Sequence, residues 1–216
     1  GVGAVLALLA VTVDETDGRI VESDIYFNTF FPWSTAEAGS TDGYDVESIA
    51  PHEIGHLFGL SRSALGETEL VSGGRRLIAA EAVMLPIAFT RGNIADRTLK
   101  ADDIAGISDI YGTTTFSRSF GSISGRVTKS GRGVQGAHVV AFNPKTGKLV
   151  GGFSLNESGD FVIAGLDPGA YVLRAEPLDD GDVNSFFDDD FEVDVDFHVA
   201  FYERVVAVPR GGGARD

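Results

Sequence analysis

The sequence predicts two domains, an α+β domain over residues 1–113 and an all-β sandwich over residues 122–210. In the first part, extended apolar runs alternate with segments whose apolar residues recur at helical spacing. In the second part, short strand-like runs are separated by turns rich in Gly, Pro, Asn and Asp, a pattern that favours a small sandwich. The polar, small-residue stretch 114–121 is interpreted as the linker, and residues 211–216 as a disordered tail.

The composition is that of a globular protein with an acidic surface. Of its 216 residues, 43% are hydrophobic and 23% are charged, and the net charge is −15. Nucleic acid is excluded as a partner because its binding needs clustered Lys and Arg. No apolar run is long enough to span a membrane. The absence of cysteine excludes disulfides, a thiolate metal site and a cysteine nucleophile. No feature of the sequence defines an oligomeric state.

Two extended segments open the first domain. Ala4–Val13 is an apolar run without an initiating Met or a basic flank, so it is interpreted as a buried strand and not as a signal peptide. The chain is therefore expected to begin inside a domain. After a turn at residues 14–18, Arg19–Asn28 has the composition of a second strand.

A helix is predicted between Asp45 and Gly59. Asp45 is a suitable N-cap, and Gly59 is placed to end the helix. Pro51 lies inside this helix, where it removes one backbone hydrogen bond. A second helix is predicted to follow Leu99–Ala101, with two aspartates in its first turn, where negative charge is favourable.

The stretch His52-Glu53-Ile54-Gly55-His56 carries the strongest chemical prediction. On a helix, histidines at positions i and i+4 point from one face, so both imidazoles can bind one metal ion. Imidazole nitrogens at this spacing suit Zn²⁺. Glu53 is then placed to take a proton from a metal-bound water and to pass it to the leaving amine. The alternative is two core histidines held by hydrogen bonds and a solvated glutamate.

Three blocks, in this order, resemble the matrixin branch of the metzincin metalloproteases. They are His52–Leu60, then Val83–Pro86, which is similar to the family's Met-turn, then Leu99–Gly112, which is similar to its C-terminal helix. The resemblance covers roughly residues 4–112, with the family's N-terminal helix and first strands missing. It implies a metzincin-type twisted sheet with an active-site helix and a C-terminal helix. It also implies a Zn²⁺ cofactor, a polypeptide substrate and a secreted or cell-surface location. Met84 would form an apolar floor under the metal without coordinating it.

The chain departs from that family at the third metal ligand. The family pattern places a third histidine six residues after the second, and here the position holds Arg62. A guanidinium stays protonated and has no acceptor lone pair, so Arg62 is not expected to ligate. Three outcomes remain: water completes a two-histidine site of poor activity; Glu67, Glu69 or Glu81 supplies a carboxylate; or the protein is a non-catalytic scaffold that acts as an extracellular binding or adhesion protein.

The resemblance also implies substrate contacts. The segment after the Met-turn would wall the pocket for the residue that follows the cleaved bond, and the strand ending at Asn28 would pair with an extended substrate. The expected substrate-binding residues are Ile25, Phe27, Leu85, Pro86 and Ile87. Segments 69–71 and 75–78 are predicted to form a hairpin, which either flanks the cleft or is a surface insertion without function.

The second half resembles the carboxypeptidase regulatory-like domain, a transthyretin-like β-sandwich. The similarity lies between Gly125 and Tyr171 and implies an accessory or adhesion module. The run 179–196 contains nine acidic residues. Calcium is conceivable there because clustered carboxylates are hard oxygen ligands. The spacing does not match an EF-hand, so an acidic loop followed by an alternating strand is the preferred interpretation.

Overall fold

A computed structural model of the chain describes residues 5–71, 74–88, 90–178, 183–187 and 191–215. The chain divides into two units, and each unit combines segments that are separate in sequence. The first unit comprises Gly1–Ser61 and Gly66–Lys100, and the second comprises Arg62–Leu65 and Ala101–Asp216. No helix in the described ranges is both long and apolar enough to cross a bilayer.

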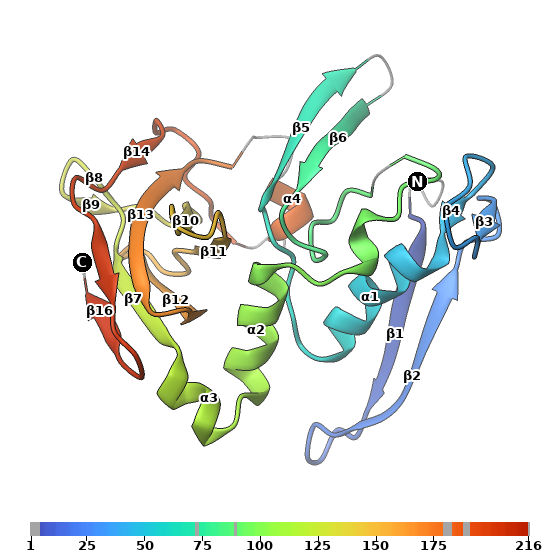
Figure 1. The fold of residues 1–216 in the computed structure, drawn as a ribbon, viewed down its shortest axis with the longest axis horizontal. Coiled ribbons are helices and arrows are strands. Elements are labelled where there is room, and N and C mark those ends of the chain that lie inside the picture. Colours follow the sequence, from blue (N-terminus) through green and yellow to red (C-terminus); the bar gives the residue numbers. More distant parts are fainter. Residues whose placement is uncertain (1–4, 72–73, 89, 179–182, 188–190, 216) are drawn as a thin grey trace. The chain divides into compact units, whose positions relative to one another are not determined.

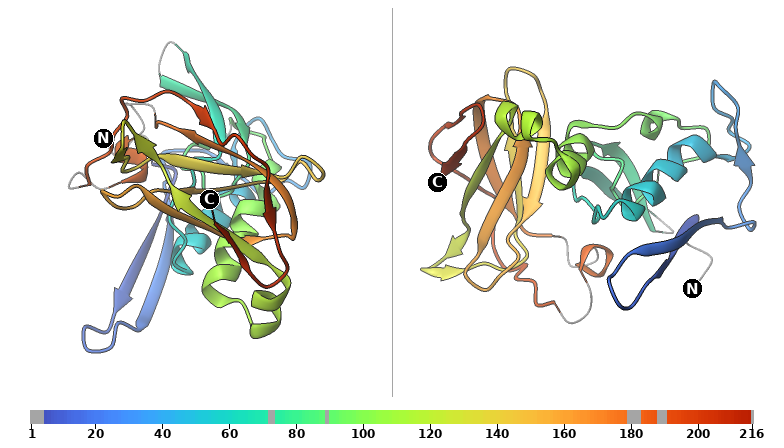
Figure 2. Two further views of the ribbon diagram at one scale, coloured as in Figure 1. Left: turned by 90° about the vertical axis from the view of Figure 1, so that its left-hand side faces the viewer. Right: turned by 90° about the horizontal axis from the view of Figure 1, so that it is seen from below.

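The first unit is built from short paired strands around one long helix (Figure 1). Its elements are β1 (Ala7–Val13), β2 (Ile20–Phe27), β3 (Trp33–Ser34), β4 (Tyr44–Asp45), α1 (Val46–Leu57), β5 (Gly66–Val71), β6 (Gly74–Ala80) and the 3-10 helix η2 (Ala95–Arg97). Strands β1 and β2 pair antiparallel, β3 and β4 pair in parallel, and β5 and β6 form an antiparallel hairpin. Helix α1 lies against β1 (Figure 2). The predicted second strand, first helix and hairpin are therefore confirmed.

The interpretation of the first strand as buried is wrong. In β1, Ala7 is buried, but Leu8, Val11 and Val13 are exposed, Leu8 at 58%. Among the described residues β1 pairs with β2 alone. Successive side chains of a strand point to opposite faces, so a two-stranded ribbon with one helix against it leaves its other face open.

The second unit begins with a helix and continues as two facing sheets. Its helices are α2 (Ala101–Tyr111), α3 (Thr114–Ser119) and α4 (Val183–Phe186). Its strands are β7 (Gly121–Arg126), β8 (Thr128–Lys129), β9 (Arg132–Gly133), β10 (His138–Phe142), β11 (Leu149–Phe153), β12 (Asp160–Leu166), β13 (Gly169–Glu176), β14 (Ala200–Phe201), β15 (Val206–Val208) and β16 (Gly213–Arg215). One sheet has the order β11-β10-β13-β14, with β15 also paired to β13, and the other has the order β12-β7-β16.

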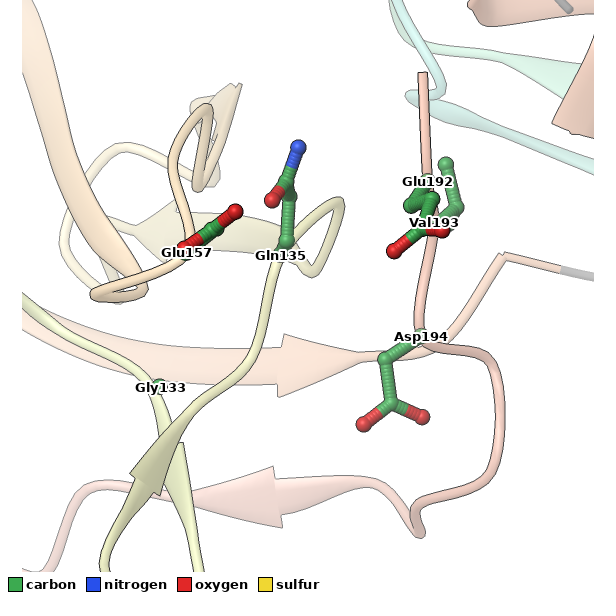
Figure 3. Close-up of a pocket in the computed structure, with 6 residues that line it drawn as sticks. All are labelled: Gly133, Gln135, Glu157, Glu192, Val193 and Asp194. Atoms are coloured by element: carbon green, nitrogen blue, oxygen red, sulfur yellow. The ribbon is translucent and has the colours of Figure 1, made fainter. Parts of the chain in front are cut away.

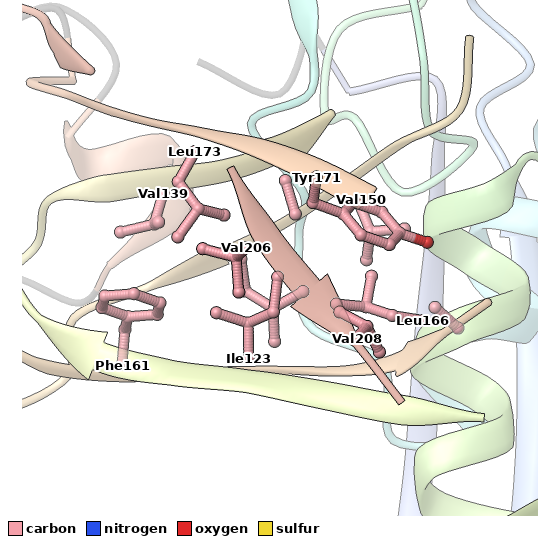
Figure 4. Packing of buried hydrophobic residues seen from close by; sticks show 12 residues of the cluster. Ile123, Val139, Val150, Phe161, Leu166, Tyr171, Leu173, Val206 and Val208 are labelled. Carbon is pink, nitrogen blue, oxygen red and sulfur yellow. The ribbon is translucent and has the colours of Figure 1, made fainter. Parts of the chain in front are cut away.

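The core of the second unit lies between these sheets (Figure 4). Ile123 from β7 and Leu166 from β12 are fully buried, and they face Val139 from β10 and Leu173 from β13. Side chains from two sheets that meet in one apolar layer define a sandwich. The predicted all-β sandwich is confirmed.

Helix α2 packs inside this second unit. Ala105 of α2 is buried in the core, and Gly165 of β12 lies against it. A Cβ at Gly165 would lie 2.7 Å from the Ala105 Cα, and Gly165 has φ +70°, so the close approach needs glycine. The Asp102 carboxylate accepts a hydrogen bond from the Gly151 backbone N–H of β11 at 2.8 Å. The polar and apolar contacts of α2 are thus both made with sandwich strands.

The structure differs from the sequence-based division at two places. The stretch interpreted as a linker contains α3, whose N-cap Thr113 accepts a hydrogen bond from the Phe116 N–H. The tail expected to be disordered contains β16, which pairs in parallel with β7. Helix α3 is held by local contacts, namely its Thr113 cap and the stacked Phe116 and Phe120 rings, whereas β16 is ordered by β7, which is distant in sequence. The domain boundaries inferred from the sequence stay predictions.

Candidate metal centre

Helix α1 ends in a turn that its sequence dictates. Gly59 has φ +87°, a left-handed conformation that glycine adopts without strain. The Leu60 N–H donates to the Gly55 carbonyl and the Gly59 N–H to the His56 carbonyl, both at 2.9 Å. This pair of bonds is the Schellman arrangement, which satisfies carbonyls that a helix end leaves without partners. The prediction that Gly59 ends the helix is confirmed.

The two histidines of α1 converge. The His52 and His56 Nε2 atoms are 3.1 Å apart, and the two rings are perpendicular with centroids separated by 4.7 Å. A four-residue step along a helix brings side chains over one another on the same face. The structure therefore brings the two predicted ligands together.

The other nitrogen of each ring is held by backbone. The His52 Nδ1 lies 2.9 Å from the Val83 carbonyl oxygen, and the His56 Nδ1 lies 2.8 Å from the Leu60 carbonyl oxygen. A carbonyl only accepts hydrogen bonds, so both Nδ1 atoms carry the proton and both Nε2 atoms present a lone pair when the rings are neutral. Backbone carbonyls of this kind fix the tautomer and orientation of metal-binding histidines.

The donor set fits a zinc ion. Two lone pairs at 3.1 Å repel one another unless a cation or a shared proton lies between them. Tetrahedral zinc with Zn–N distances of about 2.0–2.1 Å separates two nitrogen ligands by about 3.3 Å, close to the observed value. A proton held between the rings is the alternative occupant, and the two differ in their response to chelators.

Arg62 occupies the position at which a third metal ligand would be expected. Arg62 is exposed and belongs to the segment 62–65 of the second unit. Within the described part of the chain, no group of three or more His, Cys, Asp or Glu residues is placed to hold a metal ion. Glu67 and Glu81 are exposed, and the side chain of Glu69 lies outside the described residues. Two histidines are therefore the ligand set that the described residues provide.

Met84 lies beneath the helix that carries the histidines. It is 3% exposed and follows Val83, whose carbonyl holds His52. A Cβ placed on Gly55 would lie 2.3 Å from the Met84 Sδ, so the absence of a side chain at Gly55 makes room for the methionine. The Leu85 N–H contacts the Ala82 carbonyl at 3.4 Å, which gives the segment its turn.

Glu53 and the expected substrate residues have different environments. Glu53 is 8% exposed, so it is not a solvated surface carboxylate. Ile25 and Phe27 are half-buried in β2, opposite Leu9 and Ala7 of β1. Of the residues after the Met-turn, Leu85 is buried, and a Cβ on Gly66 would lie 2.6 Å from its Cδ2, whereas Pro86 and Ile87 are half-buried.

The sequence analysis missed Arg97, which lies 52 residues from its partner. Asp45 is the N-cap of α1, but its carboxylate makes no capping bond to the helix backbone. The carboxylate instead accepts hydrogen bonds from the Arg97 Nε at 2.8 Å and from the Ser48 hydroxyl at 2.9 Å. Arg97 lowers the pKa of Asp45, and the Ser48 hydrogen bond adds to this against the effect of burial. No local pattern marks a pair so far apart in sequence.

The acidic run of the second unit lines an open pocket of about 420 Å³ (Figure 3). Glu157, Gln135, Glu192 and Asp194 project around it, and the Asp194 N–H donates to the Gln135 carbonyl. Residues 179–182 and 188–190 of the acidic run lie outside the described residues. The alternating stretch from Phe191 is not a strand, and β14 begins only at Ala200. The described part of the acidic run consists of the short helix α4 and an irregular segment from Phe191, so the predicted strand is wrong.

A helix with paired histidines above a buried methionine is the arrangement that the resemblance to metalloproteases implies for the first half of the chain. The comparison with protein families is more specific. The matrixin family model matches residues 4–112, about half of the chain, and the protein belongs to the matrixin family. A carboxypeptidase regulatory-like domain matches residues 122–180. Both resemblances inferred from the sequence are confirmed.

Two curated relatives match the first half. The chain is 30% identical over 111 residues to metalloendoproteinase 4-MMP of Arabidopsis thaliana, an alignment that covers 50% of this chain and 26% of the relative. It is 29% identical over 100 residues to stromelysin-1 of Mus musculus, covering 46% of this chain and 17% of the relative. The chain thus spans about a quarter or less of the length of these relatives.

Proposed function

We propose that this protein is a zinc-dependent endopeptidase that hydrolyses peptide bonds of extended polypeptides. The observation that carries the proposal is the histidine pair, whose Nε2 atoms lie 3.1 Å apart while both Nδ1 atoms are tied to backbone carbonyls. Membership of the matrixin family supports it. By the same family likeness, we propose a metzincin-type arrangement of the first half and a site of action outside the cell.

His52 and His56 would hold the metal, and Glu53 would move the proton. A bound zinc ion lowers the pKa of its water ligand and so supplies a nucleophile at neutral pH. The Glu53 carboxylate accepts a proton as the attacking oxygen bonds to the substrate carbonyl carbon. Glu53 then donates that proton to the amine nitrogen, so the amine leaves neutral and the carboxylate is regenerated.

The substrate would bind as an added strand. Within the described residues β2 pairs with β1 only, so its other edge has backbone donors and acceptors available to an extended peptide. Ile25 and Phe27 lie on this strand. Pro86 and Ile87, half-buried after the Met-turn, would line the pocket for the residue after the cleaved bond.

A second function follows from the third-ligand position. Among the described residues, no third His, Cys, Asp or Glu is placed with His52 and His56 to hold a metal ion, and this favours weak metal binding. The carboxypeptidase regulatory-like match adds a module that suits an accessory role. The alternative is therefore a matrixin scaffold without catalysis that acts as a binding or adhesion protein through its sandwich.

Metal analysis and peptide hydrolysis separate the two functions. We expect the purified chain to bind zinc and to cleave an unstructured protein such as casein. Glu53→Ala is expected to keep the metal and lose about 10²–10⁴-fold in kcat/KM, the usual contribution of a general base. Arg62→His is expected to tighten zinc binding at least about tenfold, because it restores a third imidazole.

Arg126→His is the matched control, since Arg126 is exposed in the second unit. Full activity in Glu53→Ala would sink the mechanism. Unchanged zinc affinity in Arg62→His would sink the account of the third ligand. A wild-type chain and an Arg62→His variant that both fail to bind zinc would establish the scaffold alternative.

A further inference from the structure

Arg97 joins three segments of the first unit. Its Nε and Nη2 donate to the two carboxylate oxygens of Asp45, at 2.8 and 2.5 Å. The same side chain donates through Nη1 to the Glu37 carbonyl at 2.9 Å and through Nη2 to the Ala36 carbonyl at 2.8 Å. The Glu47 carboxylate lies 3.4 Å from its Nε. One guanidinium therefore fixes the loop at 36–37, the start of α1 and the 3-10 helix η2.

The central ion pair of this arrangement is shielded from water. The Asp45 side chain is 1% exposed and the Arg97 side chain is 19% exposed, whereas the Glu47 side chain is mostly solvated. Two parallel N–H···O bonds to a carboxylate define direction as well as distance. A buried pair of this kind is strongly destabilised when one partner is removed, because the other charge is left without compensation. Lysine offers no planar fork and cannot reproduce the geometry.

The position of Pro51 makes the contact between Arg97 and Asp45 important for the first turn of α1. Pro51 has no N–H, so the Glu47 carbonyl loses the bond that would join the first turn of α1 to the next turn. Ser48, His52 and His56 follow one another at four-residue steps and share one face of the helix. The Ser48 hydroxyl donates to the Asp45 carboxylate at 2.9 Å. The anchored carboxylate thus bonds to the face that carries both histidines.

We infer that Arg97 is a positioning residue of the metal centre, which fixes the first turn of α1 through Asp45 and Ser48 and thereby the direction of the His52 ring. The inference rests on the proposed function, since the ring direction matters through metal binding. The two ends of α1 are then held by different means. Its C-terminal end is set by its own backbone turn at Gly59, and its N-terminal end by a side chain from residue 97.

The test uses the full chain and four variants. Arg97→Ala removes every donor, and Arg97→Lys keeps the charge without the fork. Asp45→Asn removes the anionic partner, and Ser48→Ala removes only the hydroxyl link. Arg126→Ala is the control, because Arg126 and Asp160 form an Arg–Asp pair with an Nε–Oδ1 distance of 2.9 Å whose side chains are 59% and 48% exposed.

Two measurements are made on the metal-free protein and one with cobalt. Amide hydrogen exchange of Ile49 and Ala50, which make the first helical bonds of α1, is expected to quicken at least about tenfold in Arg97→Ala and less in Ser48→Ala, because local opening of the first turn becomes easier. Long-range ¹H–¹⁵N spectra of the imidazoles are expected to show His52 losing its single tautomer, while His56 keeps its own. Co²⁺ affinity, followed by the visible absorption of the bound ion, is expected to fall about 10–100-fold, as for other groups that orient ligands.

These measurements test the role of Arg97 separately from the enzyme activity. If the wild type binds neither Zn²⁺ nor Co²⁺, the proposed function fails, and the exchange and imidazole measurements still decide the role of Arg97. If Arg97→Ala does not fold, Arg97→Lys and Ser48→Ala decide it. Unchanged exchange, an unchanged His52 spectrum and unchanged Co²⁺ affinity in folded variants would overturn the inference. Equal effects in Arg126→Ala would overturn it too.

Discussion

The two units of this protein differ in how their buried apolar residues are distributed. In the second unit, two sheets enclose a continuous apolar layer that includes Ile123, Ile163 and Leu166. In the first unit, four buried apolar residues form the Met-turn, residues 82–85, and two more are Ala7 and Leu77; its buried polar residues among those described are Asp45, Ser48 and Glu53. The second unit is thus stabilised mainly by apolar area, and the first by a few directed contacts around the helix of the metal centre.

This difference predicts where substitutions act. Loss of a core side chain in the sandwich removes stability and leaves a cavity. Loss of the close fit between Gly55 and Met84 is expected to cost less stability and to change the position of Met84.

Leu166→Ala is expected to cost about 2–5 kcal/mol of unfolding free energy, because Leu166 is fully enclosed by the two sheets. Leu155→Ala, at an exposed position in the same unit, is the control and should change stability little. Urea denaturation followed by circular dichroism measures both. Equal effects of the two variants would contradict the view that the facing sheets supply the stability.

Gly165→Ala is expected to cost about 2–4 kcal/mol, from the left-handed backbone and from the collision with the Ala105 Cα. Gly131→Ala shares the left-handed conformation, with φ +80°, but its Cβ would meet nothing within 4 Å. The control should therefore cost about 1–2 kcal/mol. The difference between the destabilisation of Gly165→Ala and that of Gly131→Ala measures the packing of α2 on β12. Equal destabilisation would show that Gly165 and Ala105 do not pack closely.

Gly55→Ala is expected to cost about 1 kcal/mol of stability, since the gain of about 0.5–1 kcal/mol from replacing a helical glycine offsets part of the overpacking. Its larger effect should be on the metal site, because the Met84 Sδ has to move from its place 2.3 Å from the new Cβ. Combining it with Met84→Ala should relieve the collision, so the effects of the two substitutions on stability should not add. Strict additivity would show that Gly55 does not accommodate Met84.

Asp45 of the first unit and Asp102 of the second unit should contribute to stability with opposite dependence on pH. Arg97 lowers the pKa of Asp45, so its stabilisation of the first unit is present above the unfolded pKa of about 3.9 and is lost as pH falls through the lower folded value. Burial raises the pKa of Asp102, more than hydrogen bonds from Gly151 and Ser63 lower it. Folding therefore favours the neutral Asp102 carboxyl, and the contribution of Asp102 to the stability of the second unit declines as pH rises from about 3.9 through the higher folded pKa.

Trp33, the single tryptophan, reports unfolding of the first unit by fluorescence. Amide signals of the sandwich report the second unit. Asp45→Asn should reduce the loss of stability on acidification in the first unit alone, and Asp102→Asn should reduce only the decline of the second unit's stability with rising pH. A common pH profile for both units, unchanged by either substitution, would refute this assignment.

Features with a local sequence signal were predictable. Gly59 at a helix end, the β5–β6 hairpin and the sandwich strands follow from residues that lie next to one another in the chain. The convergence of His52 and His56 follows from their helical spacing alone. The Met-turn and its place beneath the helix were implied by family resemblance, and Gly55 supplies the physical reason.

Other features depend on contacts between distant residues, which no local pattern records. The partnership of Asp45 with Arg97 joins residues 52 positions apart. The tautomer of His52 depends on a carbonyl 31 residues away. The exposure of β1 could not be predicted, because an apolar run does not reveal how many neighbours its strand will have.

Helix α2 has a consequence for how this chain can be cut and recombined. It lies within the stretch that matches the matrixin family, but its packing partners are β11 and β12 of the adjoining module. Recombination in the gene near codon 113 would give one product helix α2 without the strands against which it packs. The other product would be a sandwich whose β11 and β12 lack α2. Helix α2 therefore belongs to the compact unit of the sandwich, although its sequence belongs to the matrixin match.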